Sequence, residues 1–179
     1  RLEIDDAEWQ RAMEAIRGEV PGALLEFGAL DVSSLESVRS FAKALKQPKI
    51  DLLVNNAGVM AIPRELTVDG FERQFGTNHL GHFALTGLLF SRLNAGGRIV
   101  NVSSNAHHAG RMDFDDLRAE KSYSKWGRYA QSKQANLLFT FELQRRIDAA
   151  GLALKALACH PGYSSTNLFA AADTGLVNR

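Results

Sequence analysis

The chain has 179 residues, and its 21 Lys and Arg residues nearly balance 20 Asp and Glu residues to leave a formal net charge of +1. This balance argues against a polyanionic partner such as a nucleic acid, and the single cysteine, Cys159, excludes an internal disulfide. No apolar run approaches the ~18 residues of a membrane span and no signal peptide is recognisable, so we expect a cytoplasmic protein with one domain over residues 1–179.

The hydrophobic pattern alternates between helical and extended segments along the chain. Apolar residues at helical spacing predict a first helix over residues 6–19, before a break at Pro21 and Gly22. A capping-box spacing between Ser33 and Glu36 predicts a second helix that runs to about residue 45. Further helices are predicted at residues 69–93 and 125–150, and strands at residues 23–30, 50–54, 98–102 and 154–159.

Strands separated by helices predict a parallel sheet with right-handed crossovers, which is a doubly wound α/β domain of the Rossmann type. The short apolar run at residues 50–54 is typical of a strand buried on both faces. Such sheets bind ligands at the carboxyl ends of their strands. Polar or glycine-containing segments follow all four predicted strands, at residue 31 and at residues 55–58, 103–104 and 160–166. We therefore expect a binding site at this edge.

One side-chain pair on the last predicted helix carries chemistry. Tyr129 and Lys133 are four residues apart, so they share one face of the helix. An ammonium group near a phenol lowers the phenol pKa from its ordinary value of about 10. The pair therefore predicts a proton donor and acceptor for general acid–base catalysis. Because Tyr-x-x-x-Lys also occurs by chance on solvated helix faces, the interpretation depends on what accompanies it.

Several motifs accompany the pair in a consistent order: Asn55-Asn56-Ala57-Gly58, Asn78 in Thr-Asn-His-Leu-Gly, Ser103-Ser104 after a strand, and Pro161-Gly162 with Thr166. With them, the chain resembles the short-chain dehydrogenase/reductase family from about Glu14 to Leu168. In detail it is similar to the retinol-dehydrogenase-like branch, which the long interval between Ser104 and Tyr129 favours.

The resemblance implies an NAD(P)-dependent oxidoreductase that transfers a hydride between the cofactor and a carbonyl or alcohol carbon. It makes Tyr129 the general acid and base, and it makes Lys133 the residue that holds the Tyr129 pKa down and binds the nicotinamide ribose. Ser104, three residues after the strand residue Asn101, would hydrogen-bond the substrate oxygen. Asn78 would hold a water in a proton relay from Lys133 to solvent.

The resemblance also implies a cofactor site. Asp31 would accept a hydrogen bond from the adenine amino group, with Val32 contributing its backbone. The expected cofactor-binding residues are Asp31, Val32, Asn55, Ala57, Gly58, Tyr129, Lys133, Pro161, Gly162 and Thr166. We favour NADP over NAD, and Arg1 would suit a 2′-phosphate. The expected substrate is a small-molecule alcohol, aldehyde or ketone. Because the helices that carry Asn78 and Tyr129 form the usual interface in relatives, the resemblance also implies a homo-oligomer.

One part of the family pattern does not occur in the chain. The turn Thr-Gly-x-x-x-Gly-x-Gly, whose glycines let the backbone approach a pyrophosphate, is not found in these 179 residues. We therefore expect an N-terminally truncated chain that lacks the first strand–helix–strand unit and binds cofactor poorly by itself. A membrane anchor, as some relatives carry, would lie outside it.

Three alternatives remain at this point. The chain could be a non-catalytic dinucleotide-binding protein of the same fold, or an inactive fragment. The presence of all four candidate catalytic residues, Asn78, Ser104, Tyr129 and Lys133, argues against the non-catalytic protein. Another doubly wound enzyme, such as a methyltransferase, leaves their joint spacing unexplained. His79 and His82 share a helix face, but no third ligand accompanies them, so we expect no metal site.

Overall fold

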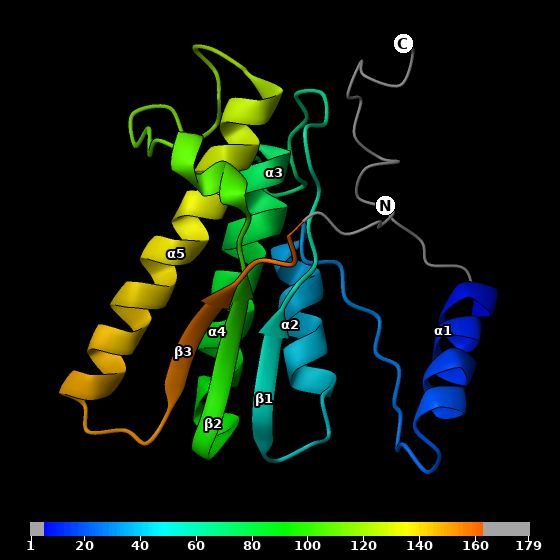
Figure 1. Ribbon diagram of the computed structural model, residues 1–179. Coiled ribbons are helices and arrows are strands. Elements are labelled where there is room, and N and C mark those ends of the chain that lie inside the picture. The colour runs from blue at the N-terminus through cyan, green and yellow to red at the C-terminus, as the bar shows by residue number, and fades with distance from the viewer. Residues whose placement is uncertain (1–5, 163–179) are drawn as a thin grey trace.

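A computed structural model of the chain describes residues 6–162 and contains a parallel sheet with the strand order β1–β2–β3 (Figure 1). The strands are β1 (Ile50–Asn55), β2 (Leu93–Val102) and β3 (Lys155–Cys159). Both pairs are parallel, and Leu53, Ile99 and Ala156 lie side by side in the register. The parallel α/β architecture predicted from the sequence is thereby confirmed.

The helices follow the hydrophobic periodicity of the sequence. They are α1 (Asp6–Glu19), α2 (Leu35–Ala44), α3 (Arg73–Phe75), α4 (Gly81–Leu89) and α5 (Lys125–Ala149). A π-helical turn (Gly76–Leu80) joins α3 to α4, and 3₁₀ turns follow at Phe90–Arg92 and Asn105–Ala109. No helix within residues 6–162 combines the length and the apolar composition that crossing a bilayer requires.

The predicted start of α2 is wrong by one residue. Ser34, not Ser33, is the N-cap, and its side chain accepts a hydrogen bond from the backbone N–H of Ser37 at 3.3 Å. Ser33 is otherwise engaged, because its N–H and hydroxyl both donate to the Asp31 carboxylate, at 2.9 and 2.6 Å. The Asp31 side chain therefore closes a turn immediately before the helix.

Three helices cover one face of the sheet. Ile147 of α5 packs with Ile99 of β2, and Val38 of α2 packs with Leu85 of α4. The partly buried Leu53 of β1 contributes to both clusters, so α2, α4 and α5 share this face. Burial of these apolar side chains stabilises the arrangement by about 1.5–3 kcal/mol for each fully buried Val, Leu or Ile.

The opposite face of the sheet differs from the prediction. Leu52 and Val54 of β1 are 55% and 49% exposed, and Leu157 of β3 is 42% exposed. The expectation that β1 is buried on both faces is therefore wrong for residues 6–162. The apolar sequence of a strand indicates that both faces can be buried, but each face is buried only where another element packs against it. Here α2, α4 and α5 all pack on the other face of the sheet.

The predicted strand at residues 23–30 is also wrong, because this segment is an irregular extended connection in which Leu24 is fully exposed. A strand forms only where a neighbour accepts its backbone hydrogen bonds, and no strand pairs with this segment among residues 6–162. Phe27 instead stacks on Trp9 of α1, with 4.8 Å between the ring centroids. Figure 1 shows α1 on the far side of this connection from the sheet.

A buried polar chain fixes the strand ends that carry the site. The side-chain amide of Asn55 donates to Asn101 at 2.8 Å and to Thr86 at 2.9 Å. Asn101 in turn donates to Thr140 at 2.9 Å. This chain links β1 and β2 to α4 and α5 at the carboxyl edge of the sheet.

Candidate active site

The parallel register brings the predicted site residues to one edge of the sheet. Asn55 pairs with Asn101, and Val102 pairs with Cys159, so the segments that follow the three strands leave the sheet together. Helix α5 carries Tyr129 and Lys133 past this edge, and the Ser103 hydroxyl donates to the Lys133 carbonyl at 2.8 Å. The structure therefore places the end of β2 directly against the helix that carries Tyr129 and Lys133.

Tyr129 and Lys133 are both buried, with 4% of each residue exposed. The Lys133 Nζ atom lies 5.7 Å from the centroid of the Tyr129 ring and donates to the Val102 carbonyl at 3.1 Å. The Tyr129 ring packs against Met60 and Ala61, which follow β1. The predicted pairing on one helix face is thus present, within an apolar environment.

Burial governs the pKa values of the pair. Burial raises the pKa of the Tyr129 phenol above its ordinary value, and a side-chain hydrogen bond with Ser104 offsets part of this rise. Burial lowers the pKa of Lys133 to about 8. The expected net lowering of the Tyr129 pKa is therefore wrong for this structure, because loss of hydration on burial outweighs the opposing effect of Ser104. The part that Lys133 plays in holding this pKa down stays a prediction.

The structure separates the two adjacent serines. The Ser104 side chain lies beside the Tyr129 phenol, and its hydroxyl accepts from the Ala106 N–H at 3.2 Å as the N-cap of a 3₁₀ turn. Ser103 turns its hydroxyl toward the Lys133 carbonyl of α5. Ser104 is thus the serine adjacent to the phenol.

Asn78 lies in the π-helical turn and is fully buried. Its side-chain oxygen accepts from the Val59 N–H at 2.8 Å, and its amide donates to the Val59 carbonyl and to the Ser132 hydroxyl, both at 2.9 Å. Asn78 therefore ties the segment after β1 to α5. Isolated π-helical turns occur frequently at functional sites, but the expected water relay through Asn78 stays a prediction.

Two positions that contribute to this arrangement were not identified from the sequence. The Ser132 hydroxyl donates to the Tyr129 carbonyl at 2.7 Å while it accepts from Asn78. The Asn136 amide donates to the Asn78 carbonyl at 3.0 Å and to the Val102 carbonyl at 3.2 Å. Val102 therefore accepts from both Asn136 and Lys133. Helical spacing could have identified Asn136 from the sequence, because it lies one turn after Lys133 on the same face of α5.

Two histidines flank this cluster, the buried His82 and the half-buried His79. His82 contacts the Asn78 carbonyl through Nδ1 at 3.1 Å, and His79 contacts the Asn136 side-chain oxygen through Nδ1 at 3.1 Å. Because these oxygens only accept, both Nδ1 atoms carry the hydrogen. Burial lowers the pKa of His82 to about 4. Within residues 6–162, no group of three or more His, Cys, Asp or Glu side chains could hold a metal ion.

The expected adenosine-side residues lie near the amino ends of α2 and α4. Asp31 uses a carboxylate oxygen in the turn with Ser33, as a helix-entry residue does. Val32 is buried, and a Cβ added to Gly81 would come within 1.9 Å of its carbonyl oxygen. The structure therefore holds the 31–32 backbone against α4, while the cofactor contact itself stays a prediction.

The remaining expected cofactor residues divide between buried and accessible positions. Asn55 is buried in the polar chain between strands, whereas Ala57 is exposed and Gly58 is half-buried. Pro161 and Gly162 follow β3 and are exposed, with Gly162 in the left-handed region at φ +72°. Thr166 lies outside the described residues.

Comparison with known proteins agrees with this geometry. The sequence model of the family described as short chain dehydrogenase matches residues 2–176. Human retinol dehydrogenase 13 is 46% identical over 169 residues, which cover 92% of this chain and 50% of that protein. The chain spans about half the length of the curated relatives it matches.

Solved structures show the same fold. An uncharacterised protein from Mycobacterium paratuberculosis matches with 55% identity and a TM-score of 0.77 over 91% of this chain and 59% of that one. A blue fluorescent protein from a metagenomic library, in complex with NADPH, matches at 26% identity with a TM-score of 0.69, over 92% and 64% of the two chains. A short-chain dehydrogenase/reductase from Burkholderia phymatum, in complex with NAD, matches at 25% identity with a TM-score of 0.71, over 94% and 57%.

Proposed function

The chain belongs to the short-chain dehydrogenase family, and on that basis we propose that it transfers a hydride between NADP or NAD and a carbonyl or alcohol substrate. The observation that carries the proposal is the buried cluster at the sheet edge, where the Ser104 side chain lies beside the Tyr129 phenol and Lys133 lies over the Tyr129 ring. The same cluster supports Tyr129 as the proton donor and acceptor.

The residues around Lys133 fit a nicotinamide cofactor. An ammonium group has three N–H donors, and within residues 6–162 Lys133 donates to the Val102 carbonyl, which leaves donors for ribose hydroxyls. A Cβ added to Gly58 would lie 3.6 Å from Lys133 Nζ and 2.9 Å from the Asn78 side-chain oxygen, so the 57–58 backbone passes close to this ammonium. When bound, the nicotinamide ring supplies or accepts the hydride.

The protein's own residues manage one proton. In reduction, the Tyr129 hydroxyl donates its proton to the substrate oxygen, and the raised pKa of Tyr129 keeps that proton in place at neutral pH. Ser104 hydrogen-bonds the same oxygen and stabilises its developing charge. The nearby Lys133 ammonium stabilises the phenolate that remains. In oxidation, the phenolate accepts the proton of the alcohol.

An apolar substrate suits the surroundings of Tyr129. Its ring packs against Met60 and Ala61, with Ala106 beside them, and the half-exposed Trp126 lies edge-on to it at 6.1 Å between centroids. The relative named retinol dehydrogenase 13 points in the same direction. We therefore propose a lipophilic alcohol, aldehyde or ketone as substrate.

The test is the variant Tyr129→Phe of the full-length gene product. Titration with NADPH and with NADH, followed by nicotinamide fluorescence, measures cofactor binding and the choice between the two. We expect Tyr129→Phe to lower kcat for aldehyde reduction by about 10²–10⁴-fold while cofactor binding stays as in the wild type. Saturable binding by a wild-type protein that turns over no carbonyl substrate would favour the non-catalytic alternative.

An oligomer interface is a further part of the proposal. Phe83 and Leu88 of α4 and Leu138 and Phe141 of α5 are between 46% and 69% exposed. The two helices lie next to each other, since Phe83 and Phe139 have ring centroids 5.2 Å apart. An exposed apolar surface of this kind supports association of two copies. Light scattering should show a dimer or tetramer that Phe141→Glu dissociates.

A further inference from the structure

The loop at residues 110–124 connects the segment of Ser104 to the helix of Tyr129, and a buried side chain at the start of this helix binds it at several points. Arg128, immediately before Tyr129, is 7% exposed, and its partner Asp116 is 6% exposed. The Arg128 guanidinium donates to the Asp116 carbonyl at 2.7 Å, to the Asp116 carboxylate at 2.8 Å and to the Ser122 carbonyl at 3.1 Å. One side chain of α5 thus binds both halves of the loop.

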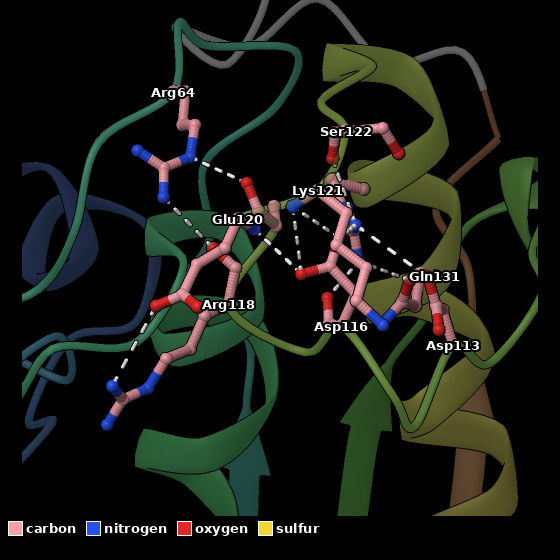
Figure 2. A network of polar contacts seen from close by, with 10 residues as sticks. Arg64, Asp113, Asp116, Arg118, Glu120, Lys121, Ser122 and Gln131 are labelled. Carbon is pink, nitrogen blue, oxygen red and sulfur yellow. Dashed lines mark hydrogen bonds and ion pairs between the residues drawn. The ribbon is translucent and has the colours of Figure 1, made fainter.

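The other side of this ion pair closes the loop on itself. The Asp116 carboxylate accepts from the backbone N–H groups of Glu120 at 2.7 Å and Lys121 at 3.3 Å, as Figure 2 shows. Burial by itself raises the pKa of the Asp116 carboxyl. These N–H groups and the Arg128 guanidinium together lower it by more, so that the pKa lies below its ordinary value. Asp116 is therefore a charged centre around which the 116–122 backbone is wrapped.

The loop is also fastened to the segment that follows β1. Arg64 donates through Nε to the Ala119 carbonyl at 2.8 Å, which Figure 2 shows as the contact reaching the loop from the neighbouring segment. Ala119 is held in the left-handed region at φ +54°, a conformation that costs an alanine on the order of 1–3 kcal/mol. The Tyr123 hydroxyl donates to the Ile62 carbonyl at 2.9 Å. Arg64 also donates through Nη2 to the Arg118 carbonyl at 3.4 Å, so three hydrogen bonds join the loop to residues 62–64.

These hydrogen bonds connect the loop to the residues that pack against the Tyr129 ring. Met60 and Ala61, from the segment joined to the loop, pack against that ring. Ala61 is fully buried and also left-handed, at φ +50°, and its N–H donates to the Gln74 side chain at 2.8 Å. Gln74 in turn donates to the Tyr123 hydroxyl at 3.0 Å. The wall beside Tyr129 and the loop therefore form one hydrogen-bonded unit.

We propose that Arg128 is a positioning residue that fixes the shape of the substrate pocket, by holding the 110–124 loop, and through it the wall at Met60 and Ala61, against the helix of Tyr129. This inference rests on the proposed function for the identity of the pocket. The geometry requires arginine, because its planar guanidinium serves several acceptors at once, whereas a lysine ammonium on a flexible stem does not reproduce that fork.

The experiment compares Arg128→Lys and Asp116→Asn in the full-length protein with Arg145→Lys, a matched control on the same helix whose side chain is 67% exposed. Hydrogen–deuterium exchange of the amides at residues 116–123 measures the loop without any need for activity. We expect ~10-fold faster exchange in Arg128→Lys and Asp116→Asn and unchanged exchange in Arg145→Lys. Circular dichroism checks that each variant is folded.

Steady-state kinetics with propanal and with retinal then test the pocket. Arg128→Lys should raise KM for retinal by on the order of 10-fold and leave kcat, the pH profile and NADPH affinity close to wild type. Wild-type exchange in Arg128→Lys, or a loss of kcat with KM unchanged, would overturn the proposal. If the wild-type protein turns over neither aldehyde, the proposed function fails together with the pocket role, and the exchange result still decides whether Arg128 clamps the loop.

Discussion

The Nζ atom of Lys133 lies 5.7 Å from the centroid of the Tyr129 ring, and its hydrogen bond goes to the Val102 carbonyl of β2. Because both side chains are buried, hydration is lost on both sides of the pair, which raises the pKa of Tyr129 and lowers that of Lys133 to about 8. Both groups therefore carry their protons at neutral pH. This protonation state suits proton donation by Tyr129 in carbonyl reduction.

The pH profile should report Lys133. As pH rises through about 8, Lys133 loses its proton, and with it the positive charge beside Tyr129. We expect kcat/KM for aldehyde reduction to fall above that pH. Lys133→Arg keeps its charge throughout this range, so the falling limb should move to higher pH even if the overall rate is reduced. A limb that stays at the same pH in Lys133→Arg would assign it to another group.

The two serines should separate in function. Ser104→Ala removes the hydroxyl beside the Tyr129 phenol and should lower kcat by about 10²-fold or more. Ser103→Ala removes the hydrogen bond to the Lys133 carbonyl, which should cost ~1 kcal/mol of stability and change kcat little. Kinetics and chemical denaturation of the two variants provide the comparison. Equal losses of kcat would contradict the assignment.

Acid should destabilise the protein through His82, whose pKa burial lowers to about 4 from an ordinary value of 6.5. Between these pH values the unfolded chain binds a proton that the folded protein does not, so the free energy of unfolding falls as pH drops from 6.5 to 4. The loss should reach roughly 3 kcal/mol. Urea denaturation at several pH values should show a smaller loss in His82→Gln, whereas His108→Gln, on an exposed ring, should behave like wild type.

Two glycines of α4 should respond in opposite ways to alanine. A Cβ on Gly81 would lie 1.9 Å from the Val32 carbonyl, so Gly81→Ala must push the 31–32 backbone away and should destabilise by about 1–3 kcal/mol or more. Gly87 has no neighbouring atom within 4 Å of such a Cβ, and Gly87→Ala should stabilise the helix by about 0.5–1 kcal/mol. Thermal denaturation measures both. If Val32 contributes to the cofactor site, Gly81→Ala should also weaken NADPH binding.

Most elements were predictable because their causes are local. The bounds of α1 and the start of α5 follow from periodicity. The predicted end of α5 at Gly151 is also observed, because this glycine adopts the left-handed conformation at φ +63° just after the C-cap. The absence of a strand at residues 23–30 was not predictable, since a strand requires a partner from elsewhere in the chain. The cap at Ser34 was missed because Ser33 is drawn to Asp31.

The sequence alone determined the family and the identities of the candidate catalytic residues, because spacing on a helix and the ends of apolar strands are properties of short segments. Only the tertiary structure decided the protonation of Tyr129 and Lys133, the different surroundings of Ser103 and Ser104, and the clamp between Arg128 and Asp116. These features depend on burial and on hydrogen bonds between segments far apart in the chain, and a linear pattern of residues does not specify which distant partner a side chain meets.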